Sequence, residues 1–502
     1  MSFWWNLATG WRGQTMQYWV NLTDSKQQAN VLAALRIVDP AAELGDERAP
    51  WRLTFSWTPQ LTVKLVVTGS GTNQLWEFTD PTVSDPRWRE QDRQLRLKEL
   101  IRLGIIRIFQ TILAIPVPWG ILSGVRPTKI FHFLRGRGFS IPEIRRQLLE
   151  IYALDEVKAD LVLEVGIKQE RFFKPSGTIG IYVGIPFCPT RCYYCSFPAV
   201  PLTTHGHLVK NFLAGLKLEA AGMAGLCREL GLQVESVYLG GGTPTSLDEA
   251  AFAEVIQTVK QSFMTAGTVA EFTVEAGRPE TVSRVKLQTM LDAGVTRISV
   301  NPQTMNQATL ERIGRRHTVD DIYGAVRAVQ RTDLLLNMDL IVGLPGENGA
   351  DFHDSLQKVV QLVPENITVH TLAPKRASAW RKNFSDLDLA APADLTAATE
   401  NVRRLLGQNG YQPYYLYRQR HILAEQENIG YGKPGTESIY NIQMMEERQT
   451  ILGLGAGAVT KWVTGSDFQV TRHQNPKCPA TYFGRIAAEL VKKAQQTRLL
   501  LG

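Results

Sequence analysis

Three cysteines, Cys188, Cys192 and Cys195, lie within a single run of eight residues. Three thiolates at this spacing can hold three corners of a cubane iron–sulfur cluster, which leaves one iron without a protein ligand and open to a small molecule. Two other interpretations use the same residues. One is a zinc ion with His205 or His207 as its fourth ligand, and the other is a set of free thiols.

A run of small residues follows the thiols at a distance of about fifty positions: Gly240-Gly241-Gly242-Thr243-Pro244. Without side chains, the backbone amides of such a run can approach a ligand closely. A tight turn would need the same residues. The run ends the strand that follows the thiol loop, and this position favours contact with a ligand.

Polar residues also accompany the next expected strands: Glu275 ends one, Asn301 and Gln303 follow the next, and the one after carries Asn337 and Asp339. Carboxylates and amides in these places suit a ligand that carries hydroxyls, an amine and a purine. Each residue alone is as well suited to cap the helix that follows it. Together they predict a ring of polar side chains around one cavity.

The elements that must position these residues are short apolar strands alternating with amphipathic helices. This alternation predicts an α/β fold in which parallel, right-handed βαβ units curl into an open, partial (β/α)6 barrel. In barrels the reactive groups lie where strands end and loops begin, and every motif above falls there. Zinc suits a compact knuckle better than a loop at the mouth of such a barrel. The predicted strands are 179–185, 234–239, 271–275, 297–300, 337–342 and 367–372, and the predicted helices are 208–230, 247–263, 280–293, 307–331 and 350–362.

Outside the barrel the patterns change. Alternating apolar and polar residues over 51–78 predict antiparallel strands, and helical spacing returns over 86–113 and 142–165. After 391 we expect a helix over 395–409, a tyrosine-rich strand over 414–417, a long polar loop and a terminal helix over 487–500. The predicted parts are an N-terminal α+β domain with a β-rich segment at 1–85, a helical linker region at 86–175, the barrel core at 176–391 and a small C-terminal accessory domain at 392–502.

Composition limits the class of protein. Five cysteines in 502 residues are too few for a disulfide framework, which predicts a reducing compartment such as the cytoplasm. No export signal is expected from the first residues, and no membrane insertion, because charges and prolines interrupt the apolar stretch over 105–119. A net charge of +7 suits an anionic partner. Nucleic acid is not expected, since no aromatic-rich binding module accompanies the charge.

The motifs together resemble one family. Tyr182-Val-Gly-Ile-Pro-Phe-Cys188, the thiol loop, the Gly-Gly-Gly-Thr-Pro turn and the strand of Asp339 are similar to the radical SAM (S-adenosylmethionine) oxygen-independent coproporphyrinogen III oxidases. Within that family the chain resembles the HemZ type through Gly124-Val-Arg-Pro-Thr-Lys129, 415–418 and 427–435. The resemblance covers roughly residues 120 to 465.

The resemblance implies a [4Fe-4S] cluster held by the three cysteines, with SAM on its open iron. It also implies an electron donor protein, such as flavodoxin or ferredoxin, and a tetrapyrrole substrate. The family's reaction is the oxidative decarboxylation of coproporphyrinogen III to protoporphyrinogen IX in haem biosynthesis. By the same likeness the residues that contact SAM are Tyr182, Tyr194, Gly241, Gly242, Thr243, Glu275, Gln303, Arg315, Asp339 and, by a looser match, Ala373.

One departure from the family pattern concerns the substrate. The best-characterised members have a further cysteine two positions after the third, whereas this chain has Phe197. Related members with phenylalanine there include haem-binding proteins, so haem binding or delivery is an alternative function. A third, SAM-dependent modification of RNA, would use the basic charge. If the substrate is a tetracarboxylate, we expect Arg126, Arg376 or Arg418 to face the cavity, because arginine grips carboxylates best.

Some residues near the motifs have no predicted role in chemistry, and no catalytic acid or base stands out. Cys227 fits a buried apolar position in a helix. His370 lies near the proposed cavity and is as well suited to a structural hydrogen bond as to proton transfer. Tyr415 and Tyr417 are expected to pack in the core.

Overall fold

The computed structural model describes residues 16–174, 177–264, 269–373, 378–380, 387–419 and 422–502. The chain forms two compact units, residues 1–167 and 168–502. Among the described residues, no helix combines the length and the hydrophobicity that crossing a membrane requires.

The first unit is built on a five-stranded sheet of order β2-β1-β3-β4-β5. The predicted antiparallel strands are β3 (Trp51–Trp57), β4 (Thr62–Gly69) and β5 (Thr72–Thr79). Alternate residues of β3 are buried, as expected for a sheet covered on one face. The elements that the sequence patterns did not predict are β1 (Gln17–Val20), α2 (Ser25–Val38), β2 (Glu43–Leu44) and α4 (Thr128–Gly136). The predicted helical stretches contain α3 (Arg93–Leu113), α5 (Ile141–Glu150) and α6 (Glu156–Gln169), whose last two residues belong to the second unit.

The second unit contains the predicted α/β barrel. Its six core strands pair in parallel in the order in which they occur along the chain, so that each βα unit adds one strand to the same edge. Most residues of these strands are buried, which is typical of a parallel sheet. The strands are β6 (Thr178–Ile185), β9 (Gln233–Gly241), β10 (Glu271–Ala276), β11 (Arg297–Val300), β12 (Leu335–Val342) and β13 (Asn366–Thr371).

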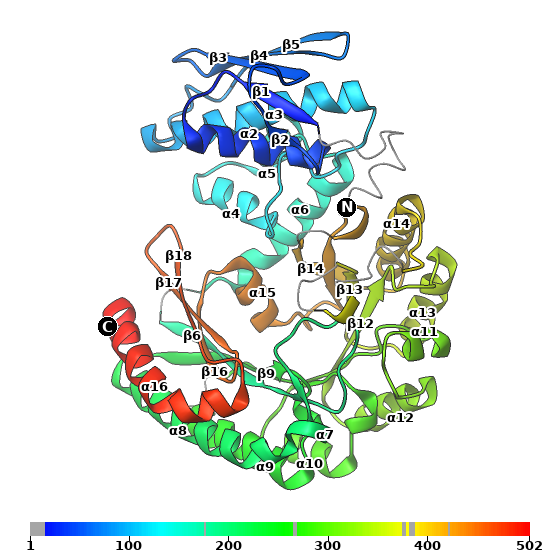
Figure 1. The fold of residues 1–502 in the computed structure, drawn as a ribbon. Helices are drawn as coiled ribbons and strands as arrows, with labels where there is room; N and C mark the ends of the chain where they lie inside the picture. Colours follow the sequence, from blue (N-terminus) through cyan, green and yellow to red (C-terminus); the bar gives the residue numbers. More distant parts are fainter. Residues whose placement is uncertain (1–15, 175–176, 265–268, 374–377, 381–386, 420–421) are drawn as a thin grey trace. The chain divides into compact units, whose positions relative to one another are not determined.

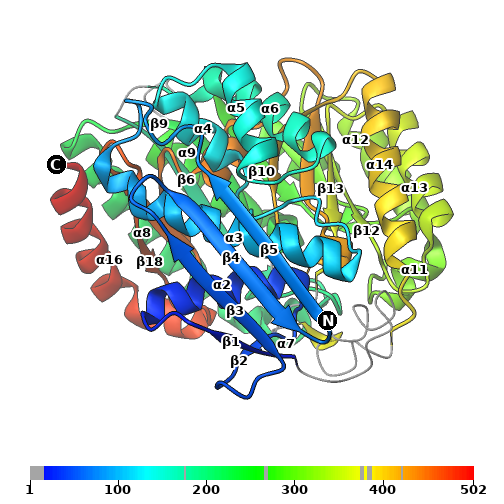
Figure 2. The same ribbon diagram turned by 90° about the horizontal axis from the view of Figure 1, so that it is seen from above.

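Helices follow one another along the outer side of this curved sheet (Figure 1). The helices that follow α8 (Val209–Glu229), up to residue 361, each begin at a polar cap, as for Asp248, whose side chain accepts from the amide of Ala251, and Asn348, which forms a capping box with Asp351. The helices are α8 (Val209–Glu229), α9 (Glu249–Phe263), α10 (Arg284–Asp292), α11 (Gln307–Arg312), α12 (Val319–Val329) and α13 (Gly349–Gln361). The terminal helix α16 (Pro479–Leu501) lies beside α8, and α14 (Pro392–Gln408) lies beside α13 (Figure 2).

The single helix predicted over 307–331 is wrong, because the structure has two helices there. Gly314 ends the first helix with a φ of +76°, a left-handed conformation that glycine adopts at little cost. Thr318 then starts α12 with its own capping box. The break leaves Arg315 on the connecting turn, free of helical geometry.

The long polar loop predicted after 417 is also wrong. The segment contains β15 (Asn428–Gly432), α15 (Ile439–Glu446), β16 (Thr450–Gly455), β17 (Val459–Thr464) and β18 (Gln469–Gln474). With β14 (Gln412–Tyr417), these strands extend the core sheet at both edges to eleven strands. The strands are short, and β15 and β16 are rich in glycine, so neither alternation nor a long apolar run marked them.

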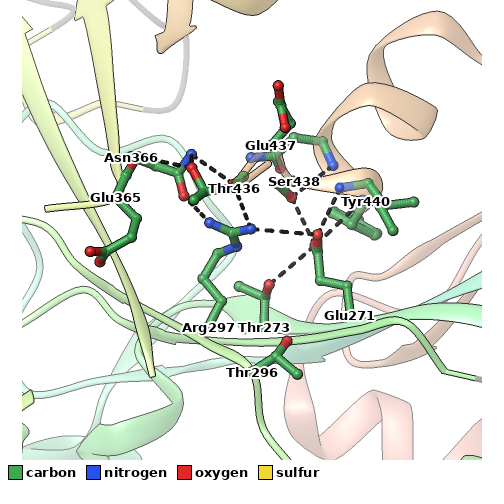
Figure 3. A network of polar contacts seen from close by, with 12 residues as sticks. Glu271, Thr273, Thr296, Arg297, Glu365, Asn366, Thr436, Glu437, Ser438 and Tyr440 are labelled. Carbon is green, nitrogen blue, oxygen red and sulfur yellow. Dashed lines mark hydrogen bonds and ion pairs between the residues drawn. The ribbon is translucent and has the colours of Figure 1, made fainter. Parts of the chain in front are cut away.

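Helix α15 packs against β9 and β14 on the side of the sheet opposite the outer helices (Figure 1). The carboxylate of Glu271, at the start of β10, accepts from Ser438 Oγ at 2.8 Å and from the amide of Ile439 at 2.7 Å (Figure 3). These donors are at the positive end of the helix, where a carboxylate stabilises it. The Arg297 guanidinium lies 3.8 Å from the same carboxylate and also donates to the carbonyl of Thr436 at 2.8 Å.

The anchored helix carries Tyr440 into a stack of aromatic rings. Its ring lies 4.3 Å from that of Tyr238 on β9 and 6.2 Å from that of Tyr182 on β6, centroid to centroid. The two strands and the helix are thus packed together by large aromatic surfaces, a major source of stability in cores.

We therefore expect Glu271→Gln to lower the free energy of unfolding by about 2 to 4 kcal/mol, because it removes the charge that faces the helix terminus and leaves Arg297 buried without its anion. Urea unfolding followed by circular dichroism measures the effect. Glu249→Gln is the matched control: Glu249 lies in the first turn of α9 but is exposed, and its replacement should cost less than about 1 kcal/mol. Equal losses in the two variants would contradict the proposed anchoring.

Candidate cluster and cofactor site

A cavity of about 320 Å³ lies at the carboxyl ends of the core strands. The three cysteines line it, together with every predicted cofactor residue except Tyr182. Parallel strands bring their carboxyl ends to one edge, so side chains far apart in the sequence converge there. The predicted residues that line the cavity are Cys188, Cys192, Tyr194, Cys195, Gly241, Gly242, Thr243, Glu275, Gln303, Arg315, Asp339 and Ala373.

The thiol loop is held by backbone hydrogen bonds. It connects the short paired strands β7 (Phe187–Cys188) and β8 (Val200–Pro201). The amide of Cys195 donates to the carbonyl of Cys192 at 3.2 Å, and the amide of Tyr193 donates to Ile313 at 3.1 Å. These bonds keep the three thiols on one turn beside the cavity.

Burial raises the pKa of the Cys188 thiol to about 11. The hydrogen bond that Thr243 Oγ1 donates to its sulfur at 3.6 Å lowers this pKa by a smaller amount. Burial also raises the pKa of Cys195. Both are therefore neutral thiols at pH 7, and a bound metal centre would deprotonate them.

The donor set fits a cubane cluster. Within the described part of the chain, no three metal-binding side chains converge on a point that a single ion would occupy. A cubane does not require such convergence, because each cysteine binds a different iron. His205 and His207, the candidate fourth ligands of a zinc ion, lie in and just after α7 (Leu202–His205), and neither is among the residues that line the cavity.

Packing and backbone conformation require glycine at the three positions of the turn 240–242, independently of any ligand. Gly241 has a φ of +103°, which side chains disfavour. A Cβ on Gly242 would lie 2.4 Å from the carbonyl oxygen of Phe187, and one on Gly240 would lie 2.8 Å from Glu275 Oε2. The glycines therefore let β9, the thiol loop and the Glu275 carboxylate approach closely, while Gly241 and Gly242 also line the cavity.

Glu275 is a buried carboxyl group at the end of β10. Burial raises its pKa to about 7, and the hydrogen bond from Tyr238 Oη, at 2.6 Å, opposes that shift. Near neutral pH the group can take either charge state. A cationic amine in the cavity would favour the carboxylate.

The loop after β11 and the turn after α11 leave polar atoms facing the cavity. Gln303 has a φ of +72°, and two backbone hydrogen bonds hold it in this conformation. Its amide donates to the carbonyl of Asp339 at 2.9 Å, and its carbonyl accepts from the amide of Ile341 at 2.9 Å. Arg315 donates from Nη1 to the carbonyl of Asn301 at 2.5 Å and from Nη2 to that of Gly277 at 3.0 Å. Among the described residues, the buried atoms Asn301 Oδ1, Gln303 Oε1 and Arg315 Nε have no hydrogen-bond partner. A polar ligand would satisfy these atoms.

Asp339 is part of a polar chain that the sequence did not predict. Asn337 Nδ2 donates to its Oδ1 at 2.8 Å, and His370 Nε2 lies 3.6 Å from its Oδ2. The other nitrogen of His370 lies 3.2 Å from Tyr417 Oη, to which Gln419 donates at 3.3 Å. Tyr417 and Gln419 come from β14 and its loop, which reach the cavity only through antiparallel pairing of the C-terminal strands.

Two predicted residues of the second unit, Tyr182 and Arg418, do not line the cavity. Tyr182 instead stacks in the tyrosine cluster beside it. Arg418 is buried and donates to Glu425 Oε2 at 2.7 Å, and it does not line the cavity. Arg126 belongs to the first unit, and Arg376 lies outside the described residues. Among the described residues, the arginines that line the cavity are Arg315 and Arg278, the second of which the sequence patterns did not single out.

A second cavity, of about 350 Å³, opens beside the first residues of β6 and β16, where Thr178 and Thr450 lie. None of the predicted site residues lines it. Chemistry in parallel barrels is found at the carboxyl ends of the strands. We therefore assign the site to the cavity that contains the cysteines.

The first test is cluster assembly. Anaerobically reconstituted protein should contain about four irons and four sulfides per chain. Serine at Cys188, Cys192 or Cys195 should abolish this content, since an alcohol is a poor ligand for iron. Cys478→Ser is the control, because Cys478 is exposed at the start of α16. Bound zinc without iron would contradict the assignment.

A second test uses the raised pKa of Glu275. The unfolded chain releases this proton near pH 4.3 and the folded chain near pH 7. The native state therefore binds more protons between these values, and its stability falls as the pH rises. Glu275→Gln removes this effect. The free energy of unfolding of the variant, minus that of the unaltered protein, should therefore increase by roughly 2 kcal/mol from pH 5 to pH 8. Both proteins are measured without cofactor. Urea unfolding at each pH measures the difference. A flat difference for Glu275→Gln would contradict the raised pKa of Glu275.

Comparison with known proteins places this site in a family. The sequence profile of the Radical SAM superfamily matches residues 182–359. Proteins of this superfamily use a [4Fe-4S] cluster and S-adenosylmethionine. Among solved structures, the coproporphyrinogen III oxidase HemN from Escherichia coli matches with a TM-score of 0.51 and 21% identity, over 65% of this chain and 73% of that one. At this identity the match shows the fold.

Two curated relatives extend the comparison. A heme chaperone HemW from Bacillus subtilis is 27% identical over 55% of this chain and 69% of its own. The oxygen-independent coproporphyrinogen-III oxidase-like protein HemZ from the same organism is 36% identical over 464 residues, which are 90% of this chain and 92% of the relative. The cysteine loop, the cavity and this near full-length similarity together show that the chain belongs to the HemZ-like, coproporphyrinogen-III oxidase-like family of radical SAM proteins.

Proposed function

We propose that the protein catalyses the oxygen-independent oxidative decarboxylation of coproporphyrinogen III to protoporphyrinogen IX. The observation that carries the proposal is the convergence of three cysteines and the predicted SAM-binding residues on one cavity, in a chain 36% identical to a coproporphyrinogen-III oxidase-like relative. The net charge of +7 suits a tetracarboxylate substrate.

The geometry supports the following proposed roles. Cys188, Cys192 and Cys195 hold the cluster. When bound, the cluster and SAM together supply hydrogen-atom abstraction from carbon, the difficult step, while the protein binds and orients. Glu275, once ionised, pairs with the SAM amine, and Tyr238 fixes its orientation.

Further contacts complete the proposed cofactor site. Gln303 and Asn301 offer unpaired carbonyl oxygens to donors of SAM. Asp339, held by Asn337, accepts from ligand hydroxyls. The glycine turn brings backbone amides to the ligand. Arg315 chiefly ties the loops after β10 and β11 together, through the carbonyls of Gly277 and Asn301.

The proposal requires a source of electrons and a reducing environment. A small electron donor protein such as flavodoxin or ferredoxin would deliver one electron to the cluster. The thiol loop and the free cysteines fit a reducing compartment such as the cytoplasm.

Haem binding without decarboxylation is the second candidate function. It is favoured by the similarity to heme chaperones over 55 to 59% of the chain and by Phe197. This side chain is 60% exposed and also lines the cavity. An exposed aromatic ring at the mouth of the site would suit a planar, apolar macrocycle.

One experiment distinguishes the two functions. Reconstituted protein is incubated anaerobically with SAM, a reductant and coproporphyrinogen III, and the porphyrins are analysed by mass spectrometry. We expect products that have lost the elements of CO₂ and two hydrogens from one and then two propionates. The Cys195→Ser variant is the control and should give none. Stoichiometric haem binding with SAM cleavage but no decarboxylated product would establish the second function instead.

A further inference from the structure

Arg278 is a buried arginine beside the thiol loop that none of the proposed roles uses. It follows β10 by two residues and precedes the short helical turn Pro279–Thr281. Only 2% of its surface is exposed, and it lines the cavity with the cysteines. Burial of a guanidinium is costly unless its charge and its donors are used.

One end of the guanidinium clamps the thiol loop. Arg278 Nη2 donates to the carbonyl oxygen of Thr190 at 2.9 Å and to Thr190 Oγ1 at 2.8 Å. Thr190 lies between Cys188 and Cys192. This pair of hydrogen bonds links β10 to the loop that carries the thiols, 88 positions away in the sequence.

The other end of the guanidinium has a charge that is only loosely balanced. Arg278 Nη1 is buried and has no hydrogen-bond partner among the described residues. The nearest carboxylate oxygen, Glu280 Oε1, is 3.8 Å away. That carboxylate is held by His317, whose Nδ1 lies 2.9 Å from Glu280 Oε2. Arg278 therefore keeps a largely uncompensated positive charge next to the thiols.

We propose that Arg278 is a positioning residue for the cluster, which fixes the thiol loop and raises the reduction potential of the cluster. Reduction adds one negative charge to a centre already held by three thiolates. A buried cation stabilises the more negative, reduced form, and burial limits screening by salt. The proposal rests on the assignment of the three cysteines as cluster ligands.

The test is a redox titration of the reconstituted cluster, followed by electron paramagnetic resonance. Arg278→Gln removes the charge, and we expect the oxidised-to-reduced ratio at a fixed potential to rise at least tenfold, a shift of about 59 mV for one electron. Arg278→Lys keeps the charge and should recover most of the potential. Arg278→Gln should also lose iron to a chelator several-fold faster, since the loop has lost its clamp. A normal potential in Arg278→Gln with a full cluster overturns the proposal.

A second variant covers the case in which Arg278→Gln assembles no cluster. Glu280→Gln removes the negative charge that partly offsets Arg278, so it should shift the potential in the opposite direction, upwards. An unchanged potential in Glu280→Gln overturns the electrostatic proposal in that case. Arg284→Gln, an exposed arginine on α10, is the matched control and should leave the potential unaltered. If the unaltered protein binds no cluster, the cysteine assignment fails instead. Neither the redox titration nor the loss of iron to a chelator depends on porphyrin turnover, so both measurements remain valid if the protein turns over no porphyrin.

Discussion

The carboxylate of Glu271 holds the first turn of α15 against the core sheet, and the geometry of the site depends on this contact. The hydrogen bonds from Ser438 and Ile439 orient the helix. The helix then places Tyr440 on Tyr238, and Tyr238 in turn donates to Glu275 in the cavity. A buried charge at one end of β10 is in this way connected to the ligand-facing carboxyl group at the other end. The contact is favourable because the negative carboxylate faces the positive, N-terminal end of the helix.

The cavity itself contains groups that are costly to bury. Glu275 has a pKa near 7, the pKa of the Cys188 thiol is raised, and three polar atoms of Asn301, Gln303 and Arg315 lack partners among the described residues. Packing elsewhere must offset these costs. A polar, cationic ligand and a metal centre would relieve them, which is the relation expected between a binding site and its ligand.

The same site explains why the family assignment and the reaction are separate questions. The cysteines, Glu275 and Asp339 would bind cluster and cofactor for any radical chemistry. The choice between a decarboxylated substrate and a carried haem depends on the rest of the cavity wall, where Phe197 and Tyr417 lie. Those two residues have no charge with which to grip a propionate, whereas the cationic Arg278 also lines the cavity.

The sequence by itself determined the thiol loop, the six core strands, and the placement of Glu275 and Gln303 at or just after strand ends and of Asp339 within β12, because local periodicity and spacing encode a parallel βα repeat. It misjudged the helix broken at Gly314 and the strands after 417, where short, glycine-rich segments have no clear period. Only the tertiary structure decided that Tyr417 from β14 reaches the cavity, that Arg278 clamps Thr190, and that Tyr182 packs beside the site. These contacts join residues tens to hundreds of positions apart, and their partners are selected by sheet pairing and burial, which leave no local pattern in the chain.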